Sequence, residues 1–101
     1  MTRLQDLTVD SFRPLMGAVF QVVEVGLERE LRLVEVGEVG RGWSAGRSGR
    51  APFSIVFEDS SDTLMPQGIH PLNHESLGSL EIFLVPIQPE DGRFRYQAIF
   101  A

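Results

Sequence analysis

The sequence contains no cysteine and no lysine. Without cysteine the chain can form neither a disulfide nor a thiolate metal site, and its composition carries no sign of a redox compartment. All nine basic residues are arginine. Arginine offers a rigid bidentate fork that lysine lacks, but codon bias in a GC-rich genome explains this usage more simply. We therefore attach no function to the missing lysine.

Long apolar runs are also missing. A membrane helix needs about 18 consecutive apolar residues, and no run approaches that length. Residues 1–6 lack the apolar stretch of a secretory signal. We therefore expect a cytoplasmic protein that does not bind membranes. The net charge of −5 also argues against nucleic acid as a partner, because its phosphates would repel the chain.

The residues that are present fit one folded domain spanning 1–101. The hydrophobic share of 43% and the charged share of 23% are typical of a globular protein. Alternating apolar residues and short turns predict an all-β fold, a small six-stranded antiparallel barrel or sandwich with a short N-terminal helix. The six strands are expected at residues 18–25, 28–39, 52–58, 67–74, 79–88 and 93–100.

The helix is expected within residues 8–17, where Pro14 keeps it short. Its apolar residues Phe12, Leu15 and Met16 have the spacing of one face, which predicts a lid on the core. In the first two strands the apolar positions change face midway, after Val22 and after Leu33. Such a change is typical of a β-bulge, and bulges favour a curved barrel over a flat sheet.

Prolines and glycines mark the later strands. Pro71 predicts that the 67–74 strand lies at an edge, and Pro86 predicts a bulge or an edge. The 79–88 strand is apolar on both faces, which predicts a central strand or a covered second face. Residues 89–92 indicate a type I turn followed by a left-handed glycine. In the last strand we expect Phe94, Tyr96, Ala98 and Phe100 to point inward and Arg93, Arg95 and Gln97 outward.

Three patterns suggest catalysis or metal binding, and none has the context it needs. Residues 42–46 match the G-x-S-x-G nucleophile elbow around Ser44, but the residues that follow cannot form the required helix. His70 and His74 would lie about 13 Å apart on a strand, too far for one metal ion, and we expect partly exposed turn histidines. We interpret Glu58, Asp59 and Asp62 as a solvated acidic turn. No catalytic residue, metal site or cofactor is predicted.

The segment at residues 40–51 is rich in glycine and serine and reads as a long loop. It holds the one cationic cluster, and the candidate binding residues are therefore Arg41, Trp43, Arg47 and Arg50. Arginines can grip phosphates or carboxylates while a tryptophan stacks on a partner. The alternative is that residues 40–51 only connect two strands and that their charged side chains keep this loop soluble.

Several runs of the chain resemble a family of small uncharacterised bacterial proteins of about this length. The runs are residues 12–17, 50–57, 66–72, 77–78, 81–87 and 95–100. The resemblance excludes most of the 40–51 loop. It implies an association with phage-tail-collar-like or tail-fibre-like proteins and hence a structural or assembly part. The family has no established activity, so the resemblance assigns no functional residues.

These observations predict a non-enzymatic interaction or assembly module, an accessory of a phage-tail-like structure. It would bind a protein partner or a second copy of itself through strand edges and the 40–51 loop. The alternative is a barrel that binds a small molecule or a carbohydrate, with Trp43, Tyr96 and the arginines at its mouth. A hydrolase that uses Ser44 is the third hypothesis.

Overall fold

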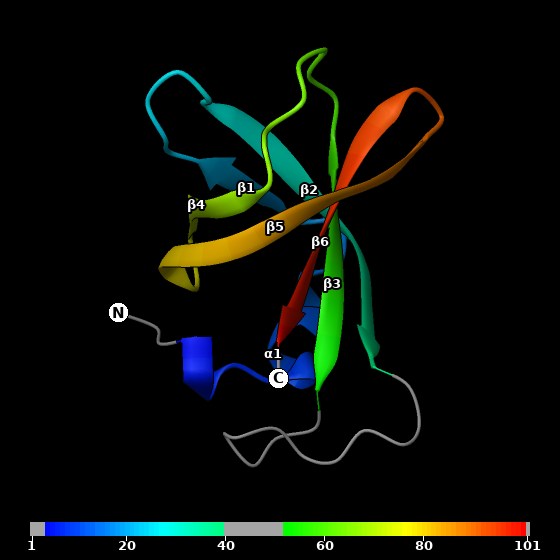
Figure 1. The fold of residues 1–101 in the computed structure, drawn as a ribbon. Coiled ribbons are helices and arrows are strands. Elements are labelled where there is room, and N and C mark those ends of the chain that lie inside the picture. The colour runs from blue at the N-terminus through cyan, green and yellow to red at the C-terminus, as the bar shows by residue number, and fades with distance from the viewer. Residues whose placement is uncertain (1–3, 40–51, 101) are drawn as a thin grey trace.

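Six antiparallel strands close into a barrel in the computed structural model, which describes residues 4–39 and 52–100 (Figure 1). The strands are β1 (Val19–Val22), β2 (Arg29–Glu38), β3 (Phe53–Asp59), β4 (Gly68–His74), β5 (Gly78–Glu90) and β6 (Arg93–Phe100). Three short helical pieces precede them: η1 (Leu4–Asp6), α1 (Val9–Phe12) and η2 (Arg13–Leu15). The predicted all-β class is confirmed, and the architecture is the barrel rather than the sandwich.

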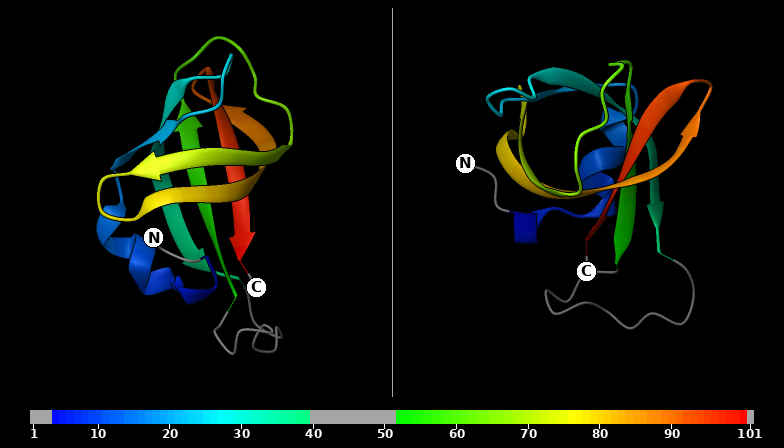
Figure 2. Two further views of the ribbon diagram at one scale, coloured as in Figure 1. Left: turned by 90° about the vertical axis from the view of Figure 1, so that its left-hand side faces the viewer. Right: turned by 45° about the horizontal axis from the view of Figure 1, so that its top comes forward.

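Neighbouring strands follow the order β1-β2-β3-β6-β5-β4, and β4 pairs with β1 to close the ring. Strands β4, β5 and β6 follow one another as hairpins, and β3 lies beside β6, which is a Greek-key arrangement. The closing contact is short, because only Gln21 and Val22 of β1 are in register with β4. Figure 2 shows how the strands curve round to this contact.

The inside of the barrel holds the core. In each strand alternate side chains point inward, as the period of two requires. The largest fully buried apolar side chains of the strands are Phe20, Leu31, Leu33, Phe53, Ile55, Phe57, Leu72, Ile82 and Leu84. In β6 the predicted inward residues Tyr96, Ala98 and Phe100 are buried, and Phe94 packs partly against the core.

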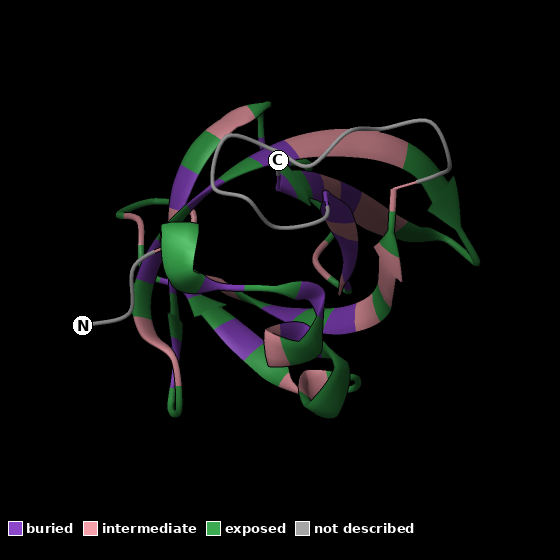
Figure 3. Cartoon of the chain, turned by 90° about the horizontal axis from the view of Figure 1, so that it is seen from below, coloured by how far each residue is buried: buried purple, intermediate pink, exposed green. Residues whose placement is uncertain are grey.

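The N-terminal helical segment closes one end of the barrel, as Figure 3 shows from below. Thr8 precedes α1, and its backbone N–H donates a hydrogen bond of 3.0 Å to the Ser11 hydroxyl. Phe12 is fully buried, and its ring centroid lies 5.8 Å from that of Phe53 and 5.6 Å from that of Phe100. The helix therefore plugs the core with one aromatic side chain.

The predicted lid face is correct for Phe12 and Leu15 and wrong for Met16. Leu15 packs partly against the core, whereas Met16 is 50% exposed. The helical segment ends at Leu15, and Gly17 reverses the chain toward β1 with a φ of +84°. Met16 lies in this reversal and so cannot continue the helical face.

One of the two predicted bulges is present. The pairing of β2 with β3 shifts register between Leu33 and Glu35, where the apolar positions change face. The bulge expected after Val22 is wrong, because β1 ends there. Val23 and Val25 then lie in the connection to β2, where they are 53% and 93% exposed.

The predicted edge position of β4 is correct only in part, because Leu72 and Asn73 pair with β1 as well as with β5. The Val23 N–H donates to the Pro71 carbonyl at 3.0 Å. Pro71 has no N–H to return to Val23, and the ladder between β1 and β4 stops at this point. The proline therefore ends the ladder between β1 and β4, and Gly68, Ile69 and His70 are in register with β5 alone.

Strand β5 lies between β4 and β6 and is central, as predicted. The bulge expected near Pro86 is confirmed by a register shift between Ile87 and Glu90. The turn that follows differs from the prediction. Asp91 and Gly92 both have positive φ, 53° and 75°, which identifies a two-residue type I′ turn rather than a type I turn.

Candidate functional site

The residues predicted from the sequence to bind a partner lie outside the described part of the chain. Arg41, Trp43, Arg47 and Arg50, and also Ser44, all fall within residues 40–51. Their roles stay predictions. The strand edges through which we expected binding are available only in part, because each of the six described strands pairs with two neighbours along part of its length. The faces and the ends of the barrel are the other surfaces open to a partner.

The most distinctive outer surface is an apolar pair on β4 and β5. Ile69 is 64% exposed and Phe83 is 50% exposed, and the two residues lie directly opposite each other. The Val23–Pro71 hydrogen bond shows that the backbone groups of the odd-numbered residues of β4 face away from β5. Ile69 and Phe83 therefore form a non-hydrogen-bonded pair, in which side chains approach most closely.

An apolar groove of about 360 Å³ adjoins this pair. Its lining includes Val23, Pro71 and Leu80 and one charged residue, Glu81. Glu81 makes no ion pair with any residue in the described ranges. We name Val23, Ile69, Pro71, Glu81 and Phe83 together the β4–β5 patch. It offers a partner apolar contact area and one unpaired carboxylate.

A second hollow, of about 180 Å³, lies on the other side of the barrel and carries both signs of charge. Its arginines already have partners, since Arg93 pairs with Glu58 at 3.0 Å and Arg32 donates to the Gly17 carbonyl at 3.0 Å. Glu30 accepts a hydrogen bond of 2.9 Å from Gln21. The polar groups of this hollow are therefore satisfied within the protein, which makes it a poorer site for a ligand.

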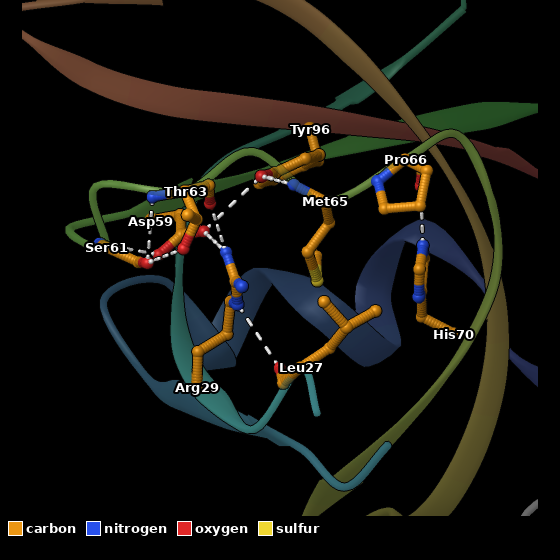
Figure 4. A network of polar contacts seen from close by, with 9 residues as sticks. All are labelled: Leu27, Arg29, Asp59, Ser61, Thr63, Met65, Pro66, His70 and Tyr96. Atoms are coloured by element: carbon orange, nitrogen blue, oxygen red, sulfur yellow. Dashed lines mark hydrogen bonds and ion pairs between the residues drawn. The ribbon is translucent and has the colours of Figure 1, made fainter. Parts of the chain in front are cut away.

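The end of the barrel opposite α1 is closed by residues 60–67, which connect β3 to β4, and a buried ion pair holds this segment (Figure 4). The guanidinium of Arg29 lies 2.8 Å from the carboxylate of Asp59, with side chains only 8% and 1% exposed. Asp59 also accepts the Ser61 N–H at 2.8 Å, and Arg29 donates to the Thr63 carbonyl. The solvated turn predicted for Asp59 is therefore wrong.

Tyr96 completes this network from β6. Its hydroxyl accepts the Met65 N–H at 2.9 Å and donates to Asp59 at 3.4 Å. Burial raises the pKa of the Tyr96 phenol above its ordinary value. Tyr96 is fully buried, so its predicted place at an open barrel mouth is wrong. The network fixes the 60–67 segment and presents no free polar group to a ligand.

Both histidines are buried on β4, so the prediction of partly exposed turn histidines is wrong. His70 is 3% exposed and His74 is 6% exposed, and the inward period of β4 places both inside the barrel. His74 accepts the backbone N–H groups of Ser76 and Leu77 at 3.0 and 3.3 Å. No cluster of three metal-ligating side chains occurs in residues 4–39 and 52–100.

Comparison with known proteins gives one match. A family model described as a domain of unknown function (DUF6916) matches residues 7–100. No curated protein and no solved structure matches the chain. No helix in the described ranges is long and apolar enough to cross a membrane. The matched description names no activity or partner, so the surface chemistry of the barrel must carry any functional argument.

Proposed function

The chain belongs to the DUF6916 family, and we propose that it is a non-enzymatic interaction module that binds a protein partner through the β4–β5 patch. The observation that carries the proposal is the exposed cross-strand pair of Ile69 and Phe83. Single exposed apolar residues are common on protein surfaces. An aromatic and a branched aliphatic side chain that lie opposite each other on neighbouring strands, beside an apolar groove, form a surface that is typical of protein interfaces.

The charges favour a partner other than a second copy. The chain carries a net charge of −5, so two copies repel each other. Glu81 lines the groove and has no cationic partner in the described ranges. A partner segment with apolar side chains and one arginine or lysine complements both features. We therefore commit to an apolar, basic segment of another protein as the occupant.

The assembly role is the finer part of the proposal. The resemblance in sequence implies an accessory of a phage-tail-like structure in a bacterium, and we retain that role as a prediction. The predicted cytoplasmic location and the contribution of the 40–51 loop stay predictions in the same way.

The alternative, a small-molecule or carbohydrate-binding barrel, has less support. It needs an open barrel mouth lined by polar groups. At the end opposite α1, the 60–67 segment covers the barrel, and its own residue Met65 is fully buried. At the other end Phe12 fills the space. Catalysis by Ser44 stays an untested hypothesis, since that residue lies outside the described ranges.

The test is a random-peptide library selected on the immobilised full-length protein, followed by affinity measurement of the selected peptides by fluorescence anisotropy. Selected peptides should be apolar and basic. Phe83→Ser and Ile69→Ser should each weaken their binding by at least about tenfold, as expected for central interface residues. Glu81→Gln should weaken the binding of peptides that carry a basic residue more than that of their uncharged analogues.

Met16→Ser is the matched control, because Met16 is as exposed as Phe83, at 50%, and lies in the chain reversal after the helical segment, away from the β4–β5 patch. It should leave peptide affinity unchanged. Equal binding by wild type and Phe83→Ser would refute the proposed site. Light scattering also measures the oligomeric state. If the wild type forms dimers at high concentration and Phe83→Ser does not, the occupant of the patch is a second copy of this chain and not another protein.

A further inference from the structure

His70 contacts two hydrogen-bond acceptors at once. Its Nδ1 lies 2.9 Å from a carboxylate oxygen of Glu24, and its Nε2 lies 2.7 Å from the carbonyl oxygen of Pro66. Figure 4 shows the contact with Pro66. The His70 side chain is 4% exposed, whereas that of Glu24 is 36% exposed. Water therefore has little access to the ring that joins the two oxygens.

A neutral imidazole cannot make both of these bonds. It carries one N–H donor and one lone-pair acceptor, and the Pro66 carbonyl and an ionised carboxylate only accept. Both contacts coexist when the ring carries a proton on each nitrogen, or when that second proton resides on the Glu24 carboxyl. In either case the pair holds one proton more than a neutral histidine beside an ionised glutamate.

The two contacts join separate parts of the chain. Glu24 lies in the connection between β1 and β2, and Pro66 lies at the end of the 60–67 segment. The middle of that segment is held by Arg29, which donates to the Thr63 carbonyl. Arginine keeps its charge at all ordinary pH values, whereas histidine changes its charge between about pH 5 and 8. One attachment is therefore permanent and the other depends on a proton.

The charged groups around His70 leave Glu24 as its direct ionic partner. At the same barrel end, Arg29 and Asp59 pair with each other and Tyr96 donates to Asp59, while Met65 lies between them and His70 in Figure 4. The residue of β5 opposite His70 is Ile82, which does not titrate. On β4 the next titratable group is His74, whose Nδ1 is engaged by Ser76 and Leu77.

We propose that His70 is a proton-dependent clamp between the β1–β2 connection and the 60–67 segment. When the proton is lost, the ring keeps one N–H for its two acceptors. The Glu24 carboxylate is 36% exposed, so water can replace His70 as its donor; the remaining N–H then stays on Nε2 with the Pro66 carbonyl, and Nδ1 presents a lone pair to Glu24. The carboxylate turns to solvent and residues 23–28 loosen. Val23 belongs both to this connection and to the β4–β5 patch, so partner binding weakens as pH rises. That last step rests on the proposed function.

The clamp is tested without any partner by hydrogen exchange of backbone amides, corrected for intrinsic rates, at about pH 5.5 and about pH 8. In the wild type, protection of the described turn at residues 23–28 should fall several-fold at the higher pH, and protection of β3 should not. In Glu24→Gln, the amide can donate to a neutral Nδ1, so protection should be the same at both pH values.

Glu75→Gln is the matched control, because it removes one carboxylate that makes no ion pair with any described residue. It should behave as the wild type does. Equal protection of residues 23–28 at both pH values in the wild type, or a loss of protection that persists in Glu24→Gln, would overturn the clamp. If the protection of residues 23–28 depends on pH but the affinity of a selected peptide does not, the clamp stands. Only its link to partner binding at the β4–β5 patch is then refuted.

Discussion

Replacing Asp59 by asparagine removes the one anion beside the buried guanidinium of Arg29 while keeping the shape of the side chain. The Asp59 side chain is 1% exposed and that of Arg29 is 8% exposed, so solvent cannot compensate for the lost charge. Breaking a buried ion pair by neutralising one partner typically destabilises a protein by about 3–5 kcal/mol. Arg29 keeps its hydrogen bonds to the Leu27 and Thr63 carbonyls, which places the expected loss near the lower limit, about 3 kcal/mol.

The measurement is urea unfolding followed by far-ultraviolet circular dichroism, with the slope of the transition as a check that the unfolded surface is unchanged. A loss of about 3 kcal/mol corresponds to a fall in Tm of roughly 12 to 24 °C for a domain of this size. Small domains are stable by about 5–15 kcal/mol, so the Asp59→Asn variant should still fold.

Glu58→Gln provides the control, because Glu58 precedes Asp59 in the chain and its side chain points the other way on β3. It pairs with Arg93, whose side chain is 56% exposed, at 3.0 Å. Exposed ion pairs contribute about 0–1 kcal/mol, so this variant should lose less than about 1 kcal/mol. If Asp59→Asn and Glu58→Gln destabilise the protein equally, the buried ion pair does not hold the 60–67 segment and the reasoning is wrong.

Two further predictions follow from the buried aromatic residues. Burial raises the pKa of the Tyr96 phenol, so the folded protein keeps a proton that the unfolded chain loses near about pH 10, and stability should fall as pH rises above that value. Tyr96 is the single tyrosine, so tyrosinate absorbance measures it directly and should appear together with unfolding; a phenol that ionises in the folded state would contradict the buried site. Phe12→Ala should destabilise the protein by about 3–5 kcal/mol in urea unfolding, because it removes the ring that packs against the stacked pair of Phe53 and Phe100. Met16→Ala should change stability by less than about 0.5 kcal/mol, and a similar loss in both variants would show that α1 does not plug the core.

The candidate surface could have been found in part from the sequence. The 79–88 strand is apolar on both faces. Once one face is assigned to the core, Phe83 on the opposite face must be an outward-pointing apolar residue. Nothing local indicates that Ile69 lies opposite it, because that register depends on how β4 and β5 pair. The arginines and Trp43 of the 40–51 segment remain the sequence's own candidate site, and the structure neither supports nor opposes them.

The buried polar residues show why sequence reasoning failed where it did. Asp59 follows Phe53, Ile55 and Phe57 in a strict period of two, so the alternation itself placed it on the inner face of β3. The run of aspartate and serine at residues 59–62 instead favours a turn. Its partner Arg29 lies 30 positions earlier in the chain, and no local sequence pattern links the two residues.

The sequence by itself determined the class of fold, the approximate positions of the strands, the bulge in β2 and the inward face of β6. These features depend on side-chain periodicity and on proline and glycine, which act within a few residues. Only the tertiary structure decided that the ring closes through β1 and β4, that His70 meets Glu24 and Pro66, and that Ile69 meets Phe83. Each of these contacts joins residues that the closure of the barrel brings together, and the strength of such contacts depends on burial that no single segment can provide.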